Sequence, residues 1–445
     1  MKILLISLGC DKNLVDSEFI LGNLVKEGFE LTDNECEADI IIVNTCAFIG
    51  DAKEESIETI LDMAQYKEEG NCRLLVVCGC LSQRYHNEIK TEIPEVDIII
   101  GATAYEDIVA AISEALAGNC EQPVERLKDI NYLPAQNTKR LYSTGTEYSY
   151  LKIAEGCNKR CTYCAIPYIR GSYRSVPEED LISQAEYLAS VGVKELIVVA
   201  QDTTLYGLDL YGEKRLPKLL NKLCAIKGIE WIRLLYAYPE DVTEELAKTI
   251  ADNPKICHYI DMPIQHASDN ILKKMGRRTN QAEIIEKINM LRSIVPDIAV
   301  RTTLITGFPG ETKEDHTQLL EFIKNMRFER LGVFCYSPEE NTPAVNYPNQ
   351  IDEETKSIRY NELMELQQQI AFDMAKNRVG ENYNVVIEGE IPEDNVYLAR
   401  TMYDAPSIDG CVFLPLTGNY MTGDIVNVNI TKASGYDLLG IPNLI

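Results

Sequence analysis

The sequence predicts an α/β protein in three parts. The first is a doubly wound α/β domain over residues 1–118, because strand-length apolar runs alternate there with amphipathic helical patterns. The same alternation returns over residues 143–376 with six strand candidates, which predicts a partial TIM-type (β/α)6 barrel. Residues 377–442 carry short β-branched runs between glycines and predict a small all-β, OB-like barrel. Residues 119–142 are polar, contain Pro123 and Pro134, and predict a linker.

Length and charge limit the class of protein. A chain of 445 residues suggests about three domains. The net charge of −26 disfavours broad, non-specific binding to nucleic acid and would attract a basic partner. No apolar stretch approaches the roughly 20 residues that span a membrane, and the amino-terminal run lacks a signal-peptide cleavage site. We therefore expect a cytoplasmic protein without a membrane partner, whose fourteen cysteines are metal ligands or buried thiols.

Three cysteines in the first domain each follow an apolar run. Residues 3–6, 40–43 and 74–77 read as buried parallel strands, and Cys10, Cys46 and Cys80 come just after them. The cysteines are about 35 residues apart, the length of one βαβ unit. Ligands bind at the carboxyl edge of such sheets, so we expect the three thiols to meet at that edge. Helices are expected over residues 14–26, 53–66 and 105–116.

The other cysteines carry less information. Cys78 precedes Cys80 by two residues and shares its face if the strand continues; we interpret Cys78 as a strand-core residue and Cys80 as the ligand. The remaining cysteines have no partner at motif spacing and are expected to be inert: Cys36, Cys72, Cys120, Cys224, Cys257, Cys335 and Cys411.

The second part carries a tighter cysteine motif. Its strand candidates are residues 148–154, 195–200, 231–236, 258–264, 298–304 and 331–336, with helical patterns at 177–191, 313–326 and 353–376. Cys157, Cys161 and Cys164 lie in the loop after the first strand, on the face where barrels of this type hold their active sites. Three closely spaced thiolates suit an iron–sulfur cluster, and three ligands rather than four leave one metal open. Lys159, Arg160 and Arg170 would offset the cluster's negative charge.

This motif, with Tyr163 just before its last cysteine, resembles the radical S-adenosylmethionine superfamily. The resemblance implies that Cys157, Cys161 and Cys164 hold a 4Fe-4S cluster whose fourth iron chelates S-adenosyl-L-methionine. Electron transfer then cleaves that cofactor to a deoxyadenosyl radical. The segment from Gly307 to Gly310 resembles the one that packs on the cofactor adenosine, although a tight strand–helix turn explains it equally well.

Polar residues end two further strands of the predicted barrel. Gln201 and Asp202 end the second strand and are candidates to bind the cofactor amino group or the substrate. Gln265 and His266 end the fourth strand on the same face, where a lone histidine is more often structural than catalytic. A basic patch could hold a substrate carboxylate or form a solvated helix end; it comprises Lys273, Lys274, Arg277 and Arg278.

With the amino-terminal cysteines Cys10, Cys46 and Cys80 included, the chain resembles one family of that superfamily, the methylthiotransferases. This resemblance covers essentially the whole chain. It implies that Cys10, Cys46 and Cys80 hold a second 4Fe-4S cluster that handles sulfur, and that the last domain is a TRAM domain. Residues 7–18, 200–204, 262–266 and 404–410 look like the branch that modifies a ribosomal protein, the RimO family. From Val379 onward the chain has nine acidic and two basic residues, which suits a basic protein better than RNA.

The resemblance implies addition of a methylthio group to the β-carbon of an aspartate in ribosomal protein S-twelve, within the small ribosomal subunit. The methyl group comes from a second S-adenosylmethionine, and the reaction also needs an electron donor and a sulfur source. Three alternatives stay open on the sequence: a transfer-RNA adenosine methylthiotransferase, a non-enzymatic iron–sulfur scaffold or electron carrier, and an RNA-binding module with structural zinc.

Overall fold

The computed structural model describes residues 1–118, 122–135 and 140–443. The chain divides into two compact units. The first unit comprises Met1–Ser143, Lys152–Leu181 and Ser337–Val345. The second unit comprises Thr144–Leu151, Ile182–Tyr336 and the chain from Asn346 onward. All six motif cysteines belong to the first unit.

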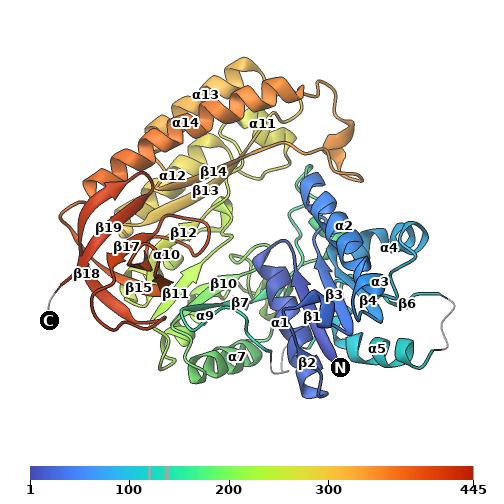
Figure 1. The fold of residues 1–445 in the computed structure, drawn as a ribbon. Helices are drawn as coiled ribbons and strands as arrows, with labels where there is room; N and C mark the ends of the chain where they lie inside the picture. Colours follow the sequence, from blue (N-terminus) through green and yellow to red (C-terminus); the bar gives the residue numbers. More distant parts are fainter. Residues whose placement is uncertain (119–121, 136–139, 444–445) are drawn as a thin grey trace. The chain divides into compact units, whose positions relative to one another are not determined.

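The first unit is built on a parallel sheet with the strand order β2-β1-β3-β4-β5-β6 (Figure 1). Its central strands are apolar and β-branched, as expected of strands buried on both faces. The strands are β1 (Lys2–Ser7), β2 (Glu30–Leu31), β3 (Ile40–Thr45), β4 (Leu74–Gly79), β5 (Ile98–Gly101) and β6 (Val124–Arg126). Chain order reverses between β1 and β3, and ligands of such sheets bind at this switch point.

Helices cover both faces of this sheet, which confirms the doubly wound α/β domain. Alternate strand residues, among them Ile41 and Leu75, pack against α2 (Gly50–Ala64) and α4 (Cys80–Glu92). Helices α1 (Asp11–Lys26) and α5 (Ile108–Leu116) contact β1, β5 and each other. Shorter helical segments are η1 (Glu35–Glu37), α3 (Tyr66–Glu69), η2 (Tyr105–Asp107) and α6 (Ile166–Ile169).

Several elements of the first unit were not predicted from the sequence, among them β2, β5, α4 and β6. Helix α4 starts at a motif cysteine and is mostly polar, with few apolar residues to signal a helix that packs on a sheet. Strand β6 has only three residues and lies within the expected linker, where it pairs with β5 in parallel. The helices also begin earlier than expected, at Asp11 and Gly50. Residues 119–121 and 136–139 of the expected linker, with Cys120, lie outside the described residues.

A short antiparallel ribbon closes the second cysteine loop. Strand β8 (Ala154–Glu155) pairs with β9 (Arg174–Ser175), Ala154 opposite Ser175 and Glu155 opposite Arg174. The loop between the two strands contains Cys157, Cys161 and Cys164 and the helix α6. Its ends are therefore held together by backbone pairing.

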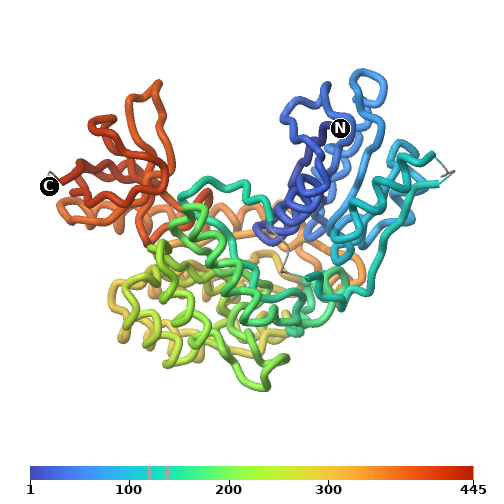
Figure 2. Tube along the Cα trace, turned by 90° about the horizontal axis from the view of Figure 1, so that it is seen from below, coloured from blue at the N-terminus to red at the C-terminus, as the bar shows by residue number. Residues whose placement is uncertain are grey.

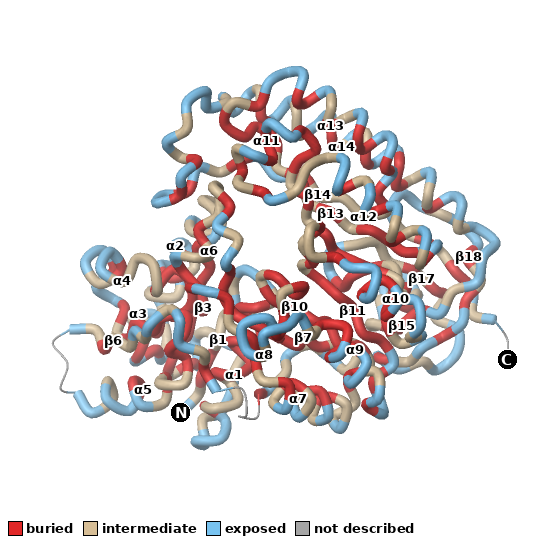
Figure 3. The backbone as a smooth tube through the Cα atoms, turned by 180° about the vertical axis from the view of Figure 1, so that it is seen from behind, coloured by how far each residue is buried: buried red, intermediate tan, exposed pale blue. Residues whose placement is uncertain are grey.

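The second unit contains a six-stranded parallel sheet whose order follows the chain, as in β/α barrels, and this confirms the partial barrel. The strands are β7 (Tyr148–Lys152), β10 (Glu195–Val199), β11 (Trp231–Leu234), β12 (Ile256–Asp261), β13 (Ala299–Thr306) and β14 (Arg330–Cys335). Figure 3 shows the backbone of β10 and β11 as buried and the outer turns of α13 and α14 as exposed. The intervening helices are α7 (Glu178–Ser190), α8 (Leu208–Tyr211), α9 (Leu216–Cys224), η3 (Pro239–Asp241), α10 (Glu244–Asp252), α11 (Asp269–Lys274), α12 (Gln281–Ile294) and α13 (Lys313–Met326). The short helix η4 (Pro343–Asn346) follows β14.

A closed β-barrel ends the chain, as predicted, and its strands are drawn in red in Figure 2. Helix α14 (Glu353–Asn377) leads into it. The strand order is β15-β16-β17-β19-β18, around a core that includes Val385, Tyr397 and Val428. The strands are β15 (Asn382–Ile391), β16 (Val396–Thr401), β17 (Val412–Pro415), β18 (Ile425–Ser434) and β19 (Asp437–Pro442). Strand β19 was not predicted. Within the described part of the chain, no helix is both long and apolar enough to cross a membrane.

Candidate active site

The first cysteine triple lies at the carboxyl ends of three neighbouring strands, β1, β3 and β4. Cys10 caps helix α1 and Cys80 is the first residue of α4, so both thiols lie at helix N-termini, where the helix dipole favours a negative charge. Cys46 follows β3 directly, next to the switch point of the sheet. The structure thus brings the three predicted thiols to one edge of one sheet.

Two glycines allow the cysteine loops to approach each other. Gly9 has a φ of +86°, and a Cβ there would lie 2.6 Å from the Cβ of Cys46. Gly79 has a φ of +96°, and a Cβ there would lie 2.3 Å from Oδ1 of Asn44. Only glycine fits either position without moving the backbone beside a cysteine.

A buried amide links all three loops of this triple. Nδ2 of Asn13 donates to the carbonyl of Leu8 at 3.1 Å and to that of Thr45 at 2.8 Å, on the loops of Cys10 and Cys46. Its Oδ1 lies 3.7 Å from Sγ of Cys80. The sequence analysis did not single out Asn13; the available signal was a polar residue at the third position of a helix whose other residues on that face are buried.

Four charged side chains form a buried cluster beside Cys80. Nζ of Lys152 pairs with Asp16 and, at 2.9 Å, with Glu155. The Arg170 guanidinium pairs with Asp16 at 2.7 Å and with Glu155 at 3.2 Å. Nε of Arg170 donates to Sγ of Cys80 at 3.3 Å. Arg170, expected to offset charge at the second triple, therefore contacts a cysteine of the first.

Burial and neighbouring thiols raise the pKa of two cysteines of the first triple, Cys46 and Cys80. Burial is the main cause that raises the pKa of Cys80 to about 12; the charge and hydrogen bond of Arg170 oppose this shift, and Cys46 and Cys10 contribute to it. Burial, then Cys10, raises the pKa of Cys46. Three mutually repelling thiolates need compensating positive charge, which a metal cluster supplies because a coordinating thiol is deprotonated.

The second triple is held by backbone hydrogen bonds. The amide of Cys157 donates to the carbonyl of Gly171 at 3.1 Å, and that of Cys164 to Cys161 at 3.1 Å. The amide of Lys159 lies 3.5 Å from Sγ of Cys157, as a donor to sulfur. Burial, then Cys161 and Cys157, raises the pKa of Cys164, so these thiols also lie within electrostatic reach of one another.

Both triples are all-sulfur donor sets, which fit iron–sulfur clusters. In the described part of the chain, no three His, Cys, Asp or Glu side chains are arranged to hold a single metal ion. In an iron–sulfur cluster each thiolate binds its own iron, and three thiolates leave one iron open for another ligand.

Most of the remaining cofactor candidates belong to the second unit, and Tyr163 belongs to the first. Asp202 is fully buried and accepts from the amide of Thr204 at 3.0 Å, so it fixes its own loop. The amides of Gly307 and Phe308 donate to the buried carboxylate of Glu311, the latter at 3.1 Å. The carbonyl of Gly310 accepts from Lys274 at 3.1 Å. Gln201 is half-buried, as is Tyr163 in the first unit.

The weaker candidates are mostly engaged within the protein. Nδ1 of His266 accepts from the amide of Ser268 at 2.9 Å, and the ring is fully buried. Arg277 is buried, donates to the carbonyl of Pro263 at 2.9 Å and lies 4.6 Å from the ring centre of Tyr238. The four residues of the expected basic patch therefore do not form one surface. Lys273 and Arg278 are exposed, whereas Lys274 and Arg277 bond to backbone carbonyls of the protein.

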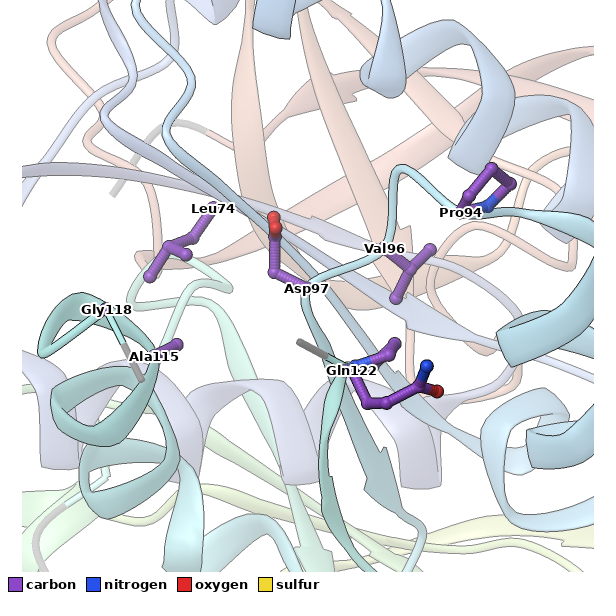
Figure 4. Close-up of a pocket in the computed structure, with 8 residues that line it drawn as sticks. Leu74, Pro94, Val96, Asp97, Ala115, Gly118 and Gln122 are labelled. Atoms are coloured by element: carbon purple, nitrogen blue, oxygen red, sulfur yellow. The ribbon is translucent and has the colours of Figure 1, made fainter. Parts of the chain in front are cut away.

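A pocket of about 230 Å³ in the first unit is unrelated to the cysteines (Figure 4). Leu74 and Asp97, which line it, lie at the amino ends of β4 and β5. Cys10, Cys46 and Cys80 lie at the opposite, carboxyl edge of the sheet, after β1, β3 and β4. Since ligands of parallel sheets bind at the carboxyl edge, this pocket is not part of the candidate site.

Comparison with known proteins agrees with three domains. Residues 2–101 match the uncharacterized protein family UPF0004, residues 151–323 the Radical SAM superfamily, and residues 379–442 the TRAM domain. The ribosomal protein uS12 methylthiotransferase RimO of Lachnoclostridium phytofermentans is 57% identical over 99% of this chain and 99% of the relative. The protein of that name from Clostridioides difficile is 50% identical over 99% of this chain and 98% of the relative. The chain belongs to the RimO family.

A solved structure supports the fold of this RimO-family chain. The radical S-adenosylmethionine methyltransferase TsrM from Kitasatospora setae superimposes with a TM-score of 0.56, covering 86% of this chain and 77% of TsrM. The sequence identity is 13%, so this likeness concerns the fold alone.

One further residue of this RimO-family chain was missed. Glu339 lies in the segment Ser337–Val345, which belongs to the first unit although it follows β14. Its side chain is 2% exposed and pairs with Lys53 of α2 at 3.0 Å and Arg84 of α4 at 3.3 Å. The same segment reaches the second cysteine loop, because the amide of Ala344 donates to Thr162 at 2.9 Å. Nothing in the local sequence pattern signals these long-range pairs.

Proposed function

We propose that this chain is a radical S-adenosylmethionine methylthiotransferase that adds a methylthio group to the β-carbon of an aspartate in ribosomal protein uS12. The observation that carries the proposal is the identity of 57% along almost the full length of a RimO relative. The target carbon–hydrogen bond is barely acidic, so acid–base residues alone would not activate it. Radical chemistry is the reaction class that such a bond requires.

In this proposal Cys157, Cys161 and Cys164 hold a 4Fe-4S cluster with one open iron for S-adenosyl-L-methionine. When bound, these cofactors supply one-electron chemistry that can remove a hydrogen atom from an unactivated carbon. Tyr163, Gln201, Asp202, Gly307 and Gly310 are proposed to contact the cofactor. The β8–β9 ribbon keeps the ends of the cysteine loop together, and the amide of Lys159 donates to the sulfur of Cys157.

We propose that Cys10, Cys46 and Cys80 hold a second 4Fe-4S cluster that handles the sulfur to be inserted. The support is geometric: three thiols at adjacent strand ends, two of them at helix N-termini, beside a buried arginine. Three ligands leave one iron open. The proposal also requires an electron donor and a sulfur source as partners.

The surface of the C-terminal barrel supports a basic protein substrate. Three of its acidic residues pair with arginines: Glu388 with Arg400, and Asp404 and Asp409 with Arg330. Among the rest, Glu381, Glu390, Glu393 and Asp394 are exposed, against Lys432 as the exposed base. The solvent-facing surface is therefore still acidic. An acidic surface attracts a basic ribosomal protein and repels RNA phosphates. A ribosomal substrate would place the enzyme in the cytoplasm.

The test is a competition between substrates. Anaerobically reconstituted enzyme receives reductant, sulfide and S-adenosylmethionine, with unmodified small ribosomal subunits and unmodified bulk transfer RNA offered together. Mass spectrometry then locates the product. We expect one added methylthio group on an aspartate of uS12. The group on adenosine instead would keep the reaction type and refute the substrate, and cofactor cleavage with neither product would refute both substrates.

A further inference from the structure

We propose that Arg170, a neighbour of the second cysteine triple in sequence, serves the first: its hydrogen bond to the sulfur of Cys80 positions the auxiliary cluster and raises that cluster's reduction potential. The inference rests on the proposed second cluster. It assigns a positioning residue that lies 90 positions away from the cysteine it contacts.

The guanidinium is fixed by contacts on all of its nitrogens. Nη1 faces the carboxylates of Asp16 and Glu155, at 2.7 and 3.2 Å, and Nη2 donates to Oδ1 of Asn13. Nε is the nitrogen that faces sulfur, at 3.3 Å from Cys80. A planar fork held at three corners cannot rotate away, so the direction of the N–H···S bond is set before any cluster binds.

Little solvent separates the Arg170 guanidinium from the sulfur of Cys80. Arg170 is 2% exposed, and Cys80 is 7% exposed. Arg170 and Lys152 together balance the carboxylates of Asp16 and Glu155, so these four side chains carry no net charge. Arginine also stays protonated at all working pH values. At low effective dielectric a fixed positive donor beside a cluster ligand interacts strongly with it.

A donor of this kind has a defined effect on redox balance. Reduction adds negative charge to a cluster, and a nearby cation with a hydrogen bond to sulfur stabilises the more negative state. Removing it must shift the potential to more negative values. Lysine keeps the charge but not the fork, so it should restore the potential only in part.

The alternative is that the four charges only hold the segment Lys152–Leu181 onto the sheet. Such a structural role would change folding and cluster yield, but the clusters that do form would keep their potential. Asn13 holds the loops of Cys10 and Cys46 together through Leu8 and Thr45, by bonds that do not involve Arg170.

The experiment isolates the auxiliary cluster in the full-length chain with Cys157, Cys161 and Cys164 changed to Ala. Redox titration followed by electron paramagnetic resonance gives its midpoint potential. In this background Arg170→Met is compared with Arg170→Lys and with Arg170→Met/Glu155→Gln, which restores local neutrality if the single change impairs folding. We expect a roughly tenfold lower reduced-to-oxidised ratio at fixed potential for both Met variants, about 59 mV for one electron, and an intermediate value for Lys.

A second measurement needs no change at Arg170. The same background protein is grown with 15N-arginine, and pulsed electron paramagnetic resonance of the reduced cluster is searched for a 15N coupling. We expect one, because Nε–H points at a cluster sulfur. Its absence, or an unchanged potential in the Met variants, would overturn this inference while leaving the cluster in place. Failure to assemble any cluster with Arg170 intact would instead overturn the second cluster itself, and this inference with it.

Discussion

The guanidinium of Arg400, in the C-terminal barrel, lies 2.7 Å from the carboxylate of Glu195, at the start of β10. Both side chains are 1% exposed. Arg233 also pairs with Glu195, at 2.6 Å, and Arg400 donates to Glu388 at 2.8 Å. A buried carboxylate between two guanidiniums thus joins β10 and β11 to the last domain.

Replacing Arg400 with Met should destabilise the second unit by about 3–5 kcal/mol, because it leaves Glu195 with one partner in a buried site. The chain has a single tryptophan, Trp231, whose ring centre lies 6.0 Å from this guanidinium. Its fluorescence during urea unfolding reports on this joint. Lys432→Met, an exposed base in the same barrel, is the matched control and should change little. An unfolding midpoint unchanged in Arg400→Met would show that the pair adds nothing.

The two cysteine triples should separate in function. Changing Cys157, Cys161 and Cys164 to Ala should abolish cleavage of S-adenosylmethionine, measured as deoxyadenosine by chromatography. Changing Cys10, Cys46 and Cys80 to Ala should retain cleavage and abolish the methylthio product, because the proposed sulfur site is lost. The variant of Cys10, Cys46 and Cys80 is the control for the variant of Cys157, Cys161 and Cys164, since both remove three thiols from the same unit. A methylthio product from the variant that lacks Cys10, Cys46 and Cys80 would refute the role of that triple.

The sequence predicted the site's cysteines better than their surroundings. Apolar runs of β-branched residues predicted β1, β3 and β4, and the carboxyl-edge rule then placed Cys10, Cys46 and Cys80 together. Asn13, Arg170 and Glu339 could not be predicted, because their partners are set by packing between distant segments. No local periodicity encodes such pairs, and only three-dimensional structure brings them together.

The acidic residues of the last domain also have partners that the sequence could not predict. Its composition predicted a basic partner, but Asp404 and Asp409 pair with Arg330 of β14, outside the C-terminal barrel, with Nε of Arg330 donating to Asp404 at 3.0 Å. The segment 404–410, which resembled the RimO branch, is therefore at least partly a structural joint within the second unit. A count of charges cannot distinguish buried ion pairs from a docking surface.

Glu339→Gln should loosen the segment Ser337–Val345. The change leaves Lys53 and Arg84 without their shared carboxylate, and hydrogen bonds to charged groups contribute about 1.5–3 kcal/mol. We expect faster hydrogen exchange of the amides in this segment, read by mass spectrometry. Glu340→Gln is the control, because that neighbouring carboxylate accepts from the hydroxyl of Tyr85, at 3.2 Å, at an exposed position. Equal exchange rates in the two variants would argue against an anchoring role.

Burial lowers the pKa of His266 to about 3, although Asp315 acts in the opposite direction and His316 and Arg359 reinforce the shift. The unfolded chain, with an ordinary histidine pKa near 6.5, therefore binds more protons between these two values. Stability must fall as the pH is lowered through that window, and this group alone should cost about 2 kcal/mol between pH 7 and pH 5. His266→Asn, which keeps an acceptor for the Ser268 amide, should flatten the pH dependence of the unfolding free energy by that amount, measured by urea titration at each pH. His258→Asn, at a partly exposed histidine, is the control for removing a histidine. Parallel curves for wild type and His266→Asn would mean that the buried ring is protonated in the folded state.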